Sequence, residues 1–175
     1  MRVLFAPWRI DYIVAEKRGG CIFCDVPAGF ETMAVGERRE RLCLFADRFV
    51  VVMLNRYPYA NGHLMVAPRH HVARLHALAA TDRQALMEMV VHCEAFLDRE
   101  IRCHGINIGA NLGKTAGAGV EDHVHVHLVP RWEGDHNFIT TIADMRVVPE
   151  ALTATFDRFA PYFADLSRPS RAEKD

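Results

Sequence analysis

The run His123-Val124-His125-Val126-His127-Leu128-Val129 alternates three histidines with branched apolar residues, and Pro130 closes it. Side chains of a strand point alternately to opposite faces, so a strand would present all three imidazoles on one face. Val124, Val126 and Leu128 would then face a core. A helix would spread the histidines in steps of roughly 200° around its axis. Because each imidazole titrates near neutral pH, we interpret the run as a chemically active strand rather than a solvated polar face.

Length and composition favour one ordinary globular domain. The chain has 175 residues, half of them apolar, and a net charge of −1. Such a chain can bury a full core, and its charge gives no reason to expect a nucleic acid or an anionic membrane as partner. No apolar run approaches the ~18 residues of a membrane span. The apolar start of residues 1–9 breaks off too early for a signal peptide.

The cysteines indicate a reducing compartment. Five is an odd number, and only Cys21 and Cys24 form a motif, so we expect a cytoplasmic protein rather than a disulfide framework. The Cys-x-x-Cys spacing suits a redox pair, half of a zinc site or two buried thiols. The redox pair is the least favoured of the three, because no thioredoxin-like strand-helix-strand pattern surrounds the motif. Half a zinc site needs two further ligands from elsewhere in the chain.

The remaining pattern predicts an α+β fold with a mainly antiparallel sheet of five strands. The expected strands are residues 42–45, 49–54, 63–68, 106–111 and the histidine run, and the first two form a hairpin. A long helix is expected over 82–102, opened by a capping box at Thr81–Gln84, with a short helix near 72–79. A last helix is expected over 149–166. Residues 26–41 are interpreted as a loop with a solvated charge run.

These elements would form one domain over residues 1–166. Residues 1–20 are expected to be an arm packed on the domain or on a partner subunit. The tail 167–175 is expected to be disordered. A glycine-rich loop, residues 112–119, precedes the histidine run. It lacks the Gly-Lys-Ser/Thr ending of a P-loop, but its backbone amides could line an anion site.

Two separate blocks resemble the histidine triad (HIT) superfamily of nucleotide hydrolases and transferases. His123-x-His125-x-His127-Leu128-Val129 is similar to the signature of the family. The segment from Asn55 through Gly62-His63 to Pro68 is similar to its second block, with Asn55 eight residues before His63. Asn111 stands near the position of a phosphate-binding amide in the family. The segments Ala6–Arg9, Ala116–Gly119 and Val129–Trp132 resemble the bacterial branch that includes diadenosine tetraphosphate phosphorylases.

The resemblance implies a HIT-like fold and roles for the triad. His125 would attack the α-phosphorus and form a covalent nucleotidyl-imidazole intermediate. His127 would donate to a phosphate oxygen or the leaving group, help that is typically worth ~10²–10⁴-fold. His63 would position the phosphate or orient the triad. No catalytic metal or organic cofactor is required, and the habit of the family is a homodimer.

The same resemblance assigns substrate contacts. Asn111 and loop amides, including that of Gly119, would share the phosphate charge. Asn55 would bind the ribose hydroxyls, and the base pocket would be formed by Ile22, Phe23 or Met53. The chain departs from the better-known pattern at Gly119-Val120-Glu121-Asp122, where many members carry Gly-Gln-Ser or Gly-Gln-Thr. This chain lacks the hydroxyl of that motif. The way in which the family assists the leaving group and selects its substrate therefore cannot be transferred to this chain on the basis of that residue.

Zinc-bearing relatives complete the Cys-x-x-Cys motif. In them two cysteines join a histidine of the second block and the first triad histidine, which correspond here to Cys21, Cys24, His71 and His123. This would be a closed structural Cys₂His₂ zinc site that pins the N-terminal segment to the histidine strand. His70, one residue away, is a rival for His71.

The function expected from these features is nucleotidyl hydrolysis or transfer on diadenosine polyphosphates or small AMP conjugates. A different hypothesis is a nonenzymatic nucleotide-binding or signalling module on the same fold. A third is a redox-metal β-barrel with His123, His125 and His127 as ligands. This third reading lacks a suitably spaced acidic ligand and leaves the Asn55–Pro68 block unexplained.

Overall fold

A five-stranded antiparallel sheet organises the chain. The computed structural model describes residues 20–135 and 150–166, so the expected arm (apart from Gly20), the tail and Pro149 lie outside the described residues. The sheet order is β1-β2-β3-β5-β4, and every neighbouring pair is antiparallel. The bounds are β1 Cys43–Ala46, β2 Val50–Leu54, β3 Leu64–Pro68, β4 Gly105–Gly109 and β5 Val126–Arg131. The predicted α+β class and five-stranded sheet are confirmed.

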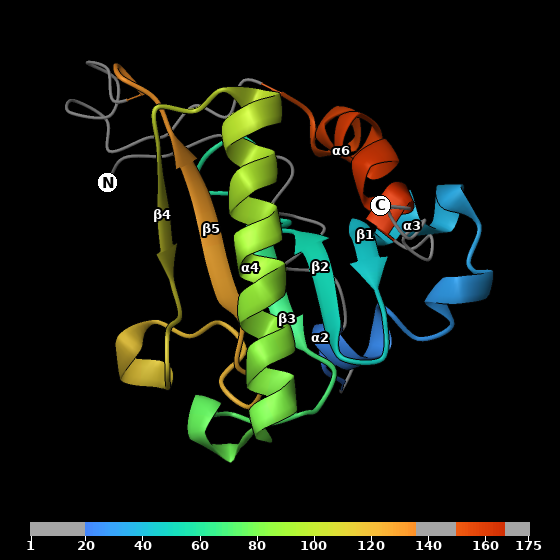
Figure 1. Ribbon diagram of the computed structural model, residues 1–175, viewed down its shortest axis with the longest axis vertical. Coiled ribbons are helices and arrows are strands. Elements are labelled where there is room, and N and C mark those ends of the chain that lie inside the picture. The colour runs from blue at the N-terminus through green and yellow to red at the C-terminus, as the bar shows by residue number, and fades with distance from the viewer. Residues whose placement is uncertain (1–19, 136–149, 167–175) are drawn as a thin grey trace, which may run out of the picture.

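Helices cover both faces of this sheet (Figure 1). The long helix α4, Ala80–Ile101, crosses one face, and α6, Leu152–Leu166, packs beside it near β1. The short helix α2, Ile22–Asp25, lies on the opposite face. One-turn 3₁₀ segments occur at Phe30–Thr32, Leu75–Ala77 and Lys114–Ala116, and the second lies where a short helix was predicted.

Two local predictions were wrong. The expected loop over 26–41 contains the helix α3, Val35–Arg41, which is rich in the helix-forming residues Glu and Arg and carries an ion pair between Glu37 and Arg41. The predicted capping box is also absent: α4 begins at Ala80, and its N-cap, Ala79, makes no side-chain cap bond. Asp82 instead lies in the first turn, where its buried carboxylate contacts His70 at 2.8 Å and complements the helix dipole.

The histidine strand also begins later than predicted. The ladder of β5 opens at Val126 and continues to Arg131, so His123 and His125 precede it. Pro68, at the end of β3, has no N–H to donate, and the ladder with β3 ends at the Val66–Val126 pair. The amide of Val124 instead donates to the carbonyl of Val72 at 2.7 Å. The chain nevertheless keeps its alternation, because Val124, Val126 and Leu128 are all buried in the main core, as predicted.

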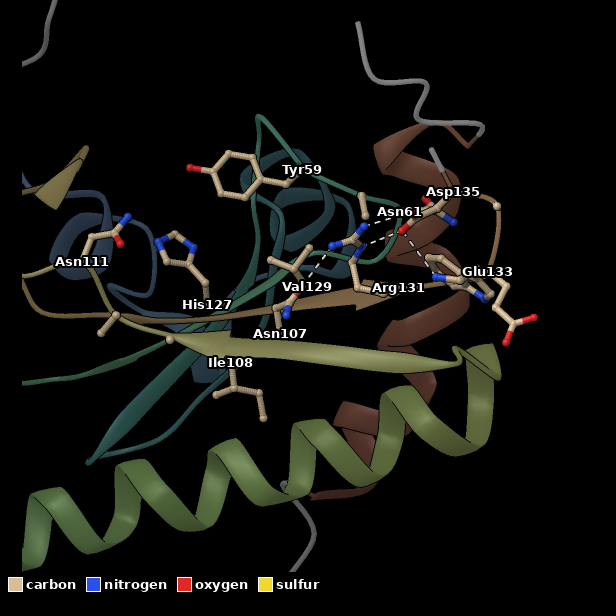
Figure 2. Close-up of a pocket in the computed structure, with 15 residues that line it drawn as sticks. Tyr59, Asn61, Asn107, Ile108, Asn111, His127, Val129, Arg131, Glu133 and Asp135 are labelled. Carbon is tan, nitrogen blue, oxygen red and sulfur yellow. Dashed lines mark hydrogen bonds and ion pairs between the residues drawn. The ribbon is translucent and has the colours of Figure 1, made fainter. Parts of the chain in front are cut away.

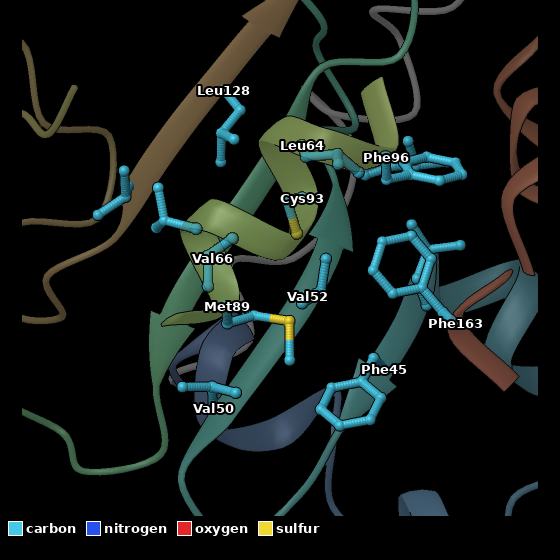
Figure 3. Close-up of a cluster of buried hydrophobic side chains, with 14 of the residues drawn as sticks. Phe45, Val50, Val52, Leu64, Val66, Met89, Cys93, Phe96, Leu128 and Phe163 are labelled. Atoms are coloured by element: carbon cyan, nitrogen blue, oxygen red, sulfur yellow. The ribbon is translucent and has the colours of Figure 1, made fainter. Parts of the chain in front are cut away.

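The strands β1, β2 and β3 bury both of their faces. Even-numbered residues of β2, β3 and β5 face α4 and α6 and form the main core, part of which is shown in Figure 3. Odd-numbered residues of β2 and β3 (Val51, Met53, Met65 and Ala67) form a second cluster on the other face with Phe23 and Phe30. His127 of β5 and the preceding His125, which packs against Phe23, share this second face. Among the described residues no helix is long and apolar enough to cross a membrane.

Candidate functional site

The register between β3 and β5 brings three imidazoles into contact. Met65 pairs with His127, so His63, two residues earlier, is a diagonal neighbour of His127 on the same face. The Nε2 atom of His63 lies 2.9 Å from the Nδ1 atom of His127. The rings of His125 and His127 are 4.8 Å apart. The structure therefore gathers the three predicted catalytic residues into one row.

Hydrogen-bond partners define the tautomers of His63 and His127. The backbone N–H of Tyr59 donates to Nδ1 of His63 at 3.2 Å, so this nitrogen carries no proton. A neutral His63 must then carry its proton on Nε2 and donate it to Nδ1 of His127. His127 in turn keeps its own proton on Nε2. The row therefore ends in an N–H donor.

The tautomer of His125 is the reverse. Its Nδ1 lies 2.9 Å from the carbonyl oxygen of His123, and only a protonated nitrogen can make that bond. The Nε2 atom consequently has a free lone pair. The Phe23 ring packs against the His125 ring at 4.7 Å and helps to bury it. An unprotonated imidazole nitrogen held in a fixed orientation is a suitable nucleophile.

Burial keeps this row uncharged. Desolvation, followed by the effects of His127 and His125, lowers the pKa of His63 to about 3. Desolvation and the neighbouring His125 lower the pKa of His127 to about 4. Burial lowers the pKa of His125, although the hydrogen bond to the His123 carbonyl acts in the opposite direction. The tautomers above are therefore those of neutral rings at physiological pH.

A second cluster lies beside the row. One ligand atom from each of Cys21, Cys24, His71 and His123 can be chosen so that all four lie within 4.8 Å of one another. The Nδ1 atom of His123 is 3.2 Å from Sγ of Cys21 and 3.5 Å from Sγ of Cys24, and Nδ1 of His71 is 3.3 Å from Sγ of Cys24. A tetrahedron with Zn–S near 2.3 Å and Zn–N near 2.0–2.1 Å has edges of about 3.5 Å. The residues present fit such a metal.

The histidines of this cluster are oriented for ligation. The Nε2–H group of His123 donates to the carbonyl of Pro68 at 2.8 Å, which leaves the lone pair of Nδ1 directed at the thiols. His71, not His70, reaches the cluster, because His70 is paired with Asp82. Burial and the adjacent Cys21 thiol raise the pKa of Cys24 to about 11. A cation would offset this cost of forming the thiolate.

The predicted substrate residues are distributed around the row. Asn111 lines the cavity beside His127, and its Nδ2 group donates to the Gly117 carbonyl at 3.5 Å. Gly119 is exposed in the same loop. Asn55 lies at the end of β2, and its Oδ1 accepts the N–H of Tyr57 at 2.9 Å in an Asx turn.

The three predicted base-pocket residues differ in exposure. Phe23 and Met53 are buried in the second apolar cluster, whereas Ile22 is exposed beside them. They lie on the same side of His127 as His125, over β2 and β3. All three stay candidates for contacts to a nucleoside.

A cavity of about 700 Å³ opens on the other side of His127 (Figure 2). Its floor is the outward face of β5 and β4, and the turn between β2 and β3 forms one wall. The side chains of the floor and this wall are His127, Val129, Arg131, Asn107, Tyr59 and Asn61. Its volume is in the range of small-molecule sites, and none of Ile22, Phe23, Met53 or Asn55 lines it.

Comparison with known proteins identifies the family. The family model described as HIT domain matches residues 37–134. The chain belongs to the HIT family. A relative named AP-4-A phosphorylase, from Mycobacterium tuberculosis (strain CDC 1551 / Oshkosh), is 36% identical over 154 residues, which are 87% of this chain and 79% of that protein.

Solved structures agree with this assignment. A Zn-bound histidine triad family protein from Mycobacterium smegmatis is similar with a TM-score of 0.59 and 26% identity, over 84% of this chain and 95% of that one. A hypothetical histidine triad nucleotide-binding protein from Sulfolobus tokodaii has a TM-score of 0.64 at 22% identity, over 89% of this chain and 99% of that one, and shows the same fold. The matched HIT domain contains His63, His125 and His127, whereas Cys21 and Cys24 precede it.

Sequence reasoning missed several groups of this HIT site. The Tyr59 amide and the Pro68 carbonyl are main-chain groups, so no side-chain pattern could reveal them. Val129 and Arg131 could have been found, because they continue the alternation of the histidines along β5. Asn61 was interpreted only as a turn residue. It donates to Glu150 at 3.1 Å and so connects the turn to the start of α6.

The buried neutral imidazole of His63 predicts a loss of stability in acid. Its pKa is about 3 when folded and about 6.5 when unfolded, so the unfolded chain binds more protons between these values. Stability is therefore full above pH 6.5 and falls as the pH drops toward 3. From pH 7 to pH 5 the free energy of unfolding should fall by about 2 kcal/mol more in the wild type than in His63→Asn. Urea unfolding at both pH values measures this difference, and parallel losses in the two proteins would contradict it.

Proposed function

We propose that this HIT protein cleaves diadenosine polyphosphates at the α-phosphate through a covalent intermediate on His125. The observation that carries the proposal is the pairing of two opposite tautomers: a free lone pair on Nε2 of His125 beside an N–H donor on Nε2 of His127. The 36% identity to a protein named AP-4-A phosphorylase supports the substrate class, and the family supports nucleotide hydrolase or transferase activity.

In the first step the lone pair on Nε2 of His125 attacks the α-phosphorus. A bond forms between nitrogen and phosphorus, and the bond to the bridging oxygen breaks, so the electron pair leaves with the departing nucleotide. The ring of His125 becomes positively charged, and the His123 carbonyl stabilises it through the Nδ1–H bond. The Nε2–H group of His127 donates a hydrogen bond to a phosphate oxygen and stabilises the charge that develops there.

In the second step water or inorganic phosphate attacks the same phosphorus. The nitrogen–phosphorus bond breaks, and its electron pair returns to Nε2 of His125, while an attacking water releases one proton to the solvent. AMP is released if water is the acceptor, and ADP if the acceptor is phosphate. Asn111, which lines the cavity beside His127, is placed to donate to the phosphate oxygens in both steps.

Product analysis tests this function. Incubation of the wild type with diadenosine tetraphosphate, with and without phosphate, should give ADP plus ATP by phosphorolysis or AMP plus ATP by hydrolysis. His125→Asn should lower the turnover by at least about 10³-fold and still bind the substrate, because the fold and the neighbouring donors remain. Chromatography of the nucleotides and calorimetric titration measure the two effects. Retained turnover in the variant, or no products from the wild type, would reject the proposal.

We also propose that Cys21, Cys24, His71 and His123 hold a structural zinc ion. The proposal is supported by the spacing of the four ligand atoms and the orientation of His123, and by the Zn-bound relative from Mycobacterium smegmatis. The ion would join the α2 segment to the start of the histidine run. Four protein ligands leave no open coordination position, so its contribution is to folding rather than to chemistry.

Replacement of one thiol tests the zinc site. Cys24→Ser should reduce the bound zinc from about one equivalent to below about 0.3 and lower the free energy of unfolding by roughly 3 kcal/mol or more. Cys103→Ser, which changes a buried thiol outside the cluster, should keep its zinc. Elemental analysis and urea unfolding of protein prepared without chelators measure both quantities. Wild-type protein with almost no zinc would exclude the site.

We further propose that the protein is a homodimer that pairs through β4 and α4. β4 is an edge strand of the described sheet, and Ile108, Met87 and Val91 beside it are 49%, 58% and 53% exposed. An exposed apolar edge of this kind is normally covered by a partner. None of the five cysteines forms a disulfide, which also fits a reducing compartment such as the cytoplasm.

A charge placed on this surface tests the dimer. Val91→Glu should sediment as a monomer at concentrations where the wild type is dimeric, because the carboxylate would be buried without a partner. Val35→Glu, on a residue that is 66% exposed on α3, should stay dimeric. Analytical ultracentrifugation separates the two states. A monomeric wild type, or a dimeric Val91→Glu variant, would be the contrary result.

A further inference from the structure

The cavity beyond His127 is a continuous groove along the outward face of β5. His127, Val129 and Arg131 alternate with buried residues, so all three side chains point into it (Figure 2). From His127 to Arg131 the strand advances by four residues, so these two positions are about 13 Å apart along the groove. Asn107 faces Val129 across the β4–β5 ladder, and Tyr59 and Asn61 rise on the side of the turn. The groove therefore begins at the proposed catalytic row and leads away from it.

The geometry of the reaction predicts which part of the substrate enters this groove. In an in-line displacement the nucleophile and the leaving oxygen lie on opposite sides of the phosphorus. His125 lies on the Phe23 side of His127, and the groove lies on the other side. A leaving group that departs from His125 past the N–H of His127 consequently enters the groove.

The charges separate the groove into two ends. The end at His127 and Asn111 offers N–H donors, and none of the described residues that line it carries a carboxylate. The far end holds Arg131, Glu133 and Asp135, and Arg131 already forms an ion pair with Asp135 at 2.5 Å. The far end is therefore unfavourable for a polyphosphate. It suits an uncharged group with an apolar face and polar edges.

Val129 and Asn107 provide contacts for such a group. Val129 gives the floor an apolar surface, against which a flat ring can pack. Asn107 accepts a hydrogen bond from Arg131 at 3.1 Å through Oδ1, and its Nδ2 group has no partner among the described residues. This N–H group can donate to an acceptor on a base or a ribose.

We propose that the groove binds the nucleoside of the departing nucleotide, with its phosphates at His127 and Asn111. This inference rests on the proposed function and adds a second nucleoside site, formed by Val129, Asn107 and Asn61, to the one expected near Phe23. The site would favour dinucleoside polyphosphates over mononucleotides with the same number of phosphates.

Filling the groove tests the proposal. Binding is measured by calorimetry in the His125→Asn background, with diadenosine tetraphosphate and with adenosine 5′-tetraphosphate, which has equal phosphates and lacks the second nucleoside. The parent should bind the dinucleotide tighter by about tenfold or more. Val129→Phe should bring this ratio close to one and leave the affinity for adenosine tetraphosphate within about twofold, because only the groove is occupied. Val35→Phe, which adds the same ring to an exposed residue, should keep the parental ratio.

Each other outcome overturns the inference. A parental ratio near one, a ratio that survives Val129→Phe, or equal weakening of both ligands would exclude a nucleoside site in the groove. The binding ratio does not depend on turnover, so the two proposals fail separately. If the wild type cleaves nothing but the His125→Asn parent keeps the binding ratio, only the proposed cleavage reaction is rejected. If the wild type cleaves the dinucleotide but the parent binds both ligands equally, only the nucleoside site in the groove is rejected.

Discussion

The hydrogen bond from His63 to His127 joins two strands that are far apart in sequence, and the geometry of the site depends on it. It exists because β3 and β5 pair with Met65 opposite His127, which places His63 diagonally across the ladder. A shift of the register by one residue would turn His127 into the core and Leu128 toward the site. The apolar side chains of β5 prevent this shift, since Val126 and Leu128 are buried in the main core on the face that α4 covers. Packing on one face thus determines the chemistry on the other.

Protonation in the row is set by main-chain groups. The Tyr59 amide and the His123 carbonyl cannot titrate, and each assigns one ring to a single tautomer. Burial under Phe23 and against neighbouring rings then disfavours the charged forms. In water an imidazole exchanges freely between tautomers and charge states. Here two adjacent rings, 4.8 Å apart, hold opposite tautomers, one an acceptor and one a donor.

Much of this arrangement could be predicted from the sequence, and the failures have physical reasons. Period-two alternation gave the common face of His123, His125 and His127, because alternation is a local property of a strand. The start of β5 was misplaced, because it depends on Pro68, which belongs to another strand. The helix Val35–Arg41 was missed, because a charged run without an apolar stripe resembles a solvated loop. The groove was missed, because it lies between the β2–β3 turn and β4, which only the folded chain brings together.

His123 serves the molecule through two chemically distinct parts. Its ring faces the thiols of Cys21 and Cys24, whereas its carbonyl oxygen orients His125. Any amino acid at this position supplies the same carbonyl, but only a ligand residue supplies the ring nitrogen. In the course of evolution a descendant of this chain can therefore lose its thiols and exchange the first histidine for another residue while the second histidine keeps its orientation. The cysteine–histidine cluster and the row of His63, His125 and His127 are therefore adjacent in space, but the cluster can be lost in evolution while the row is kept.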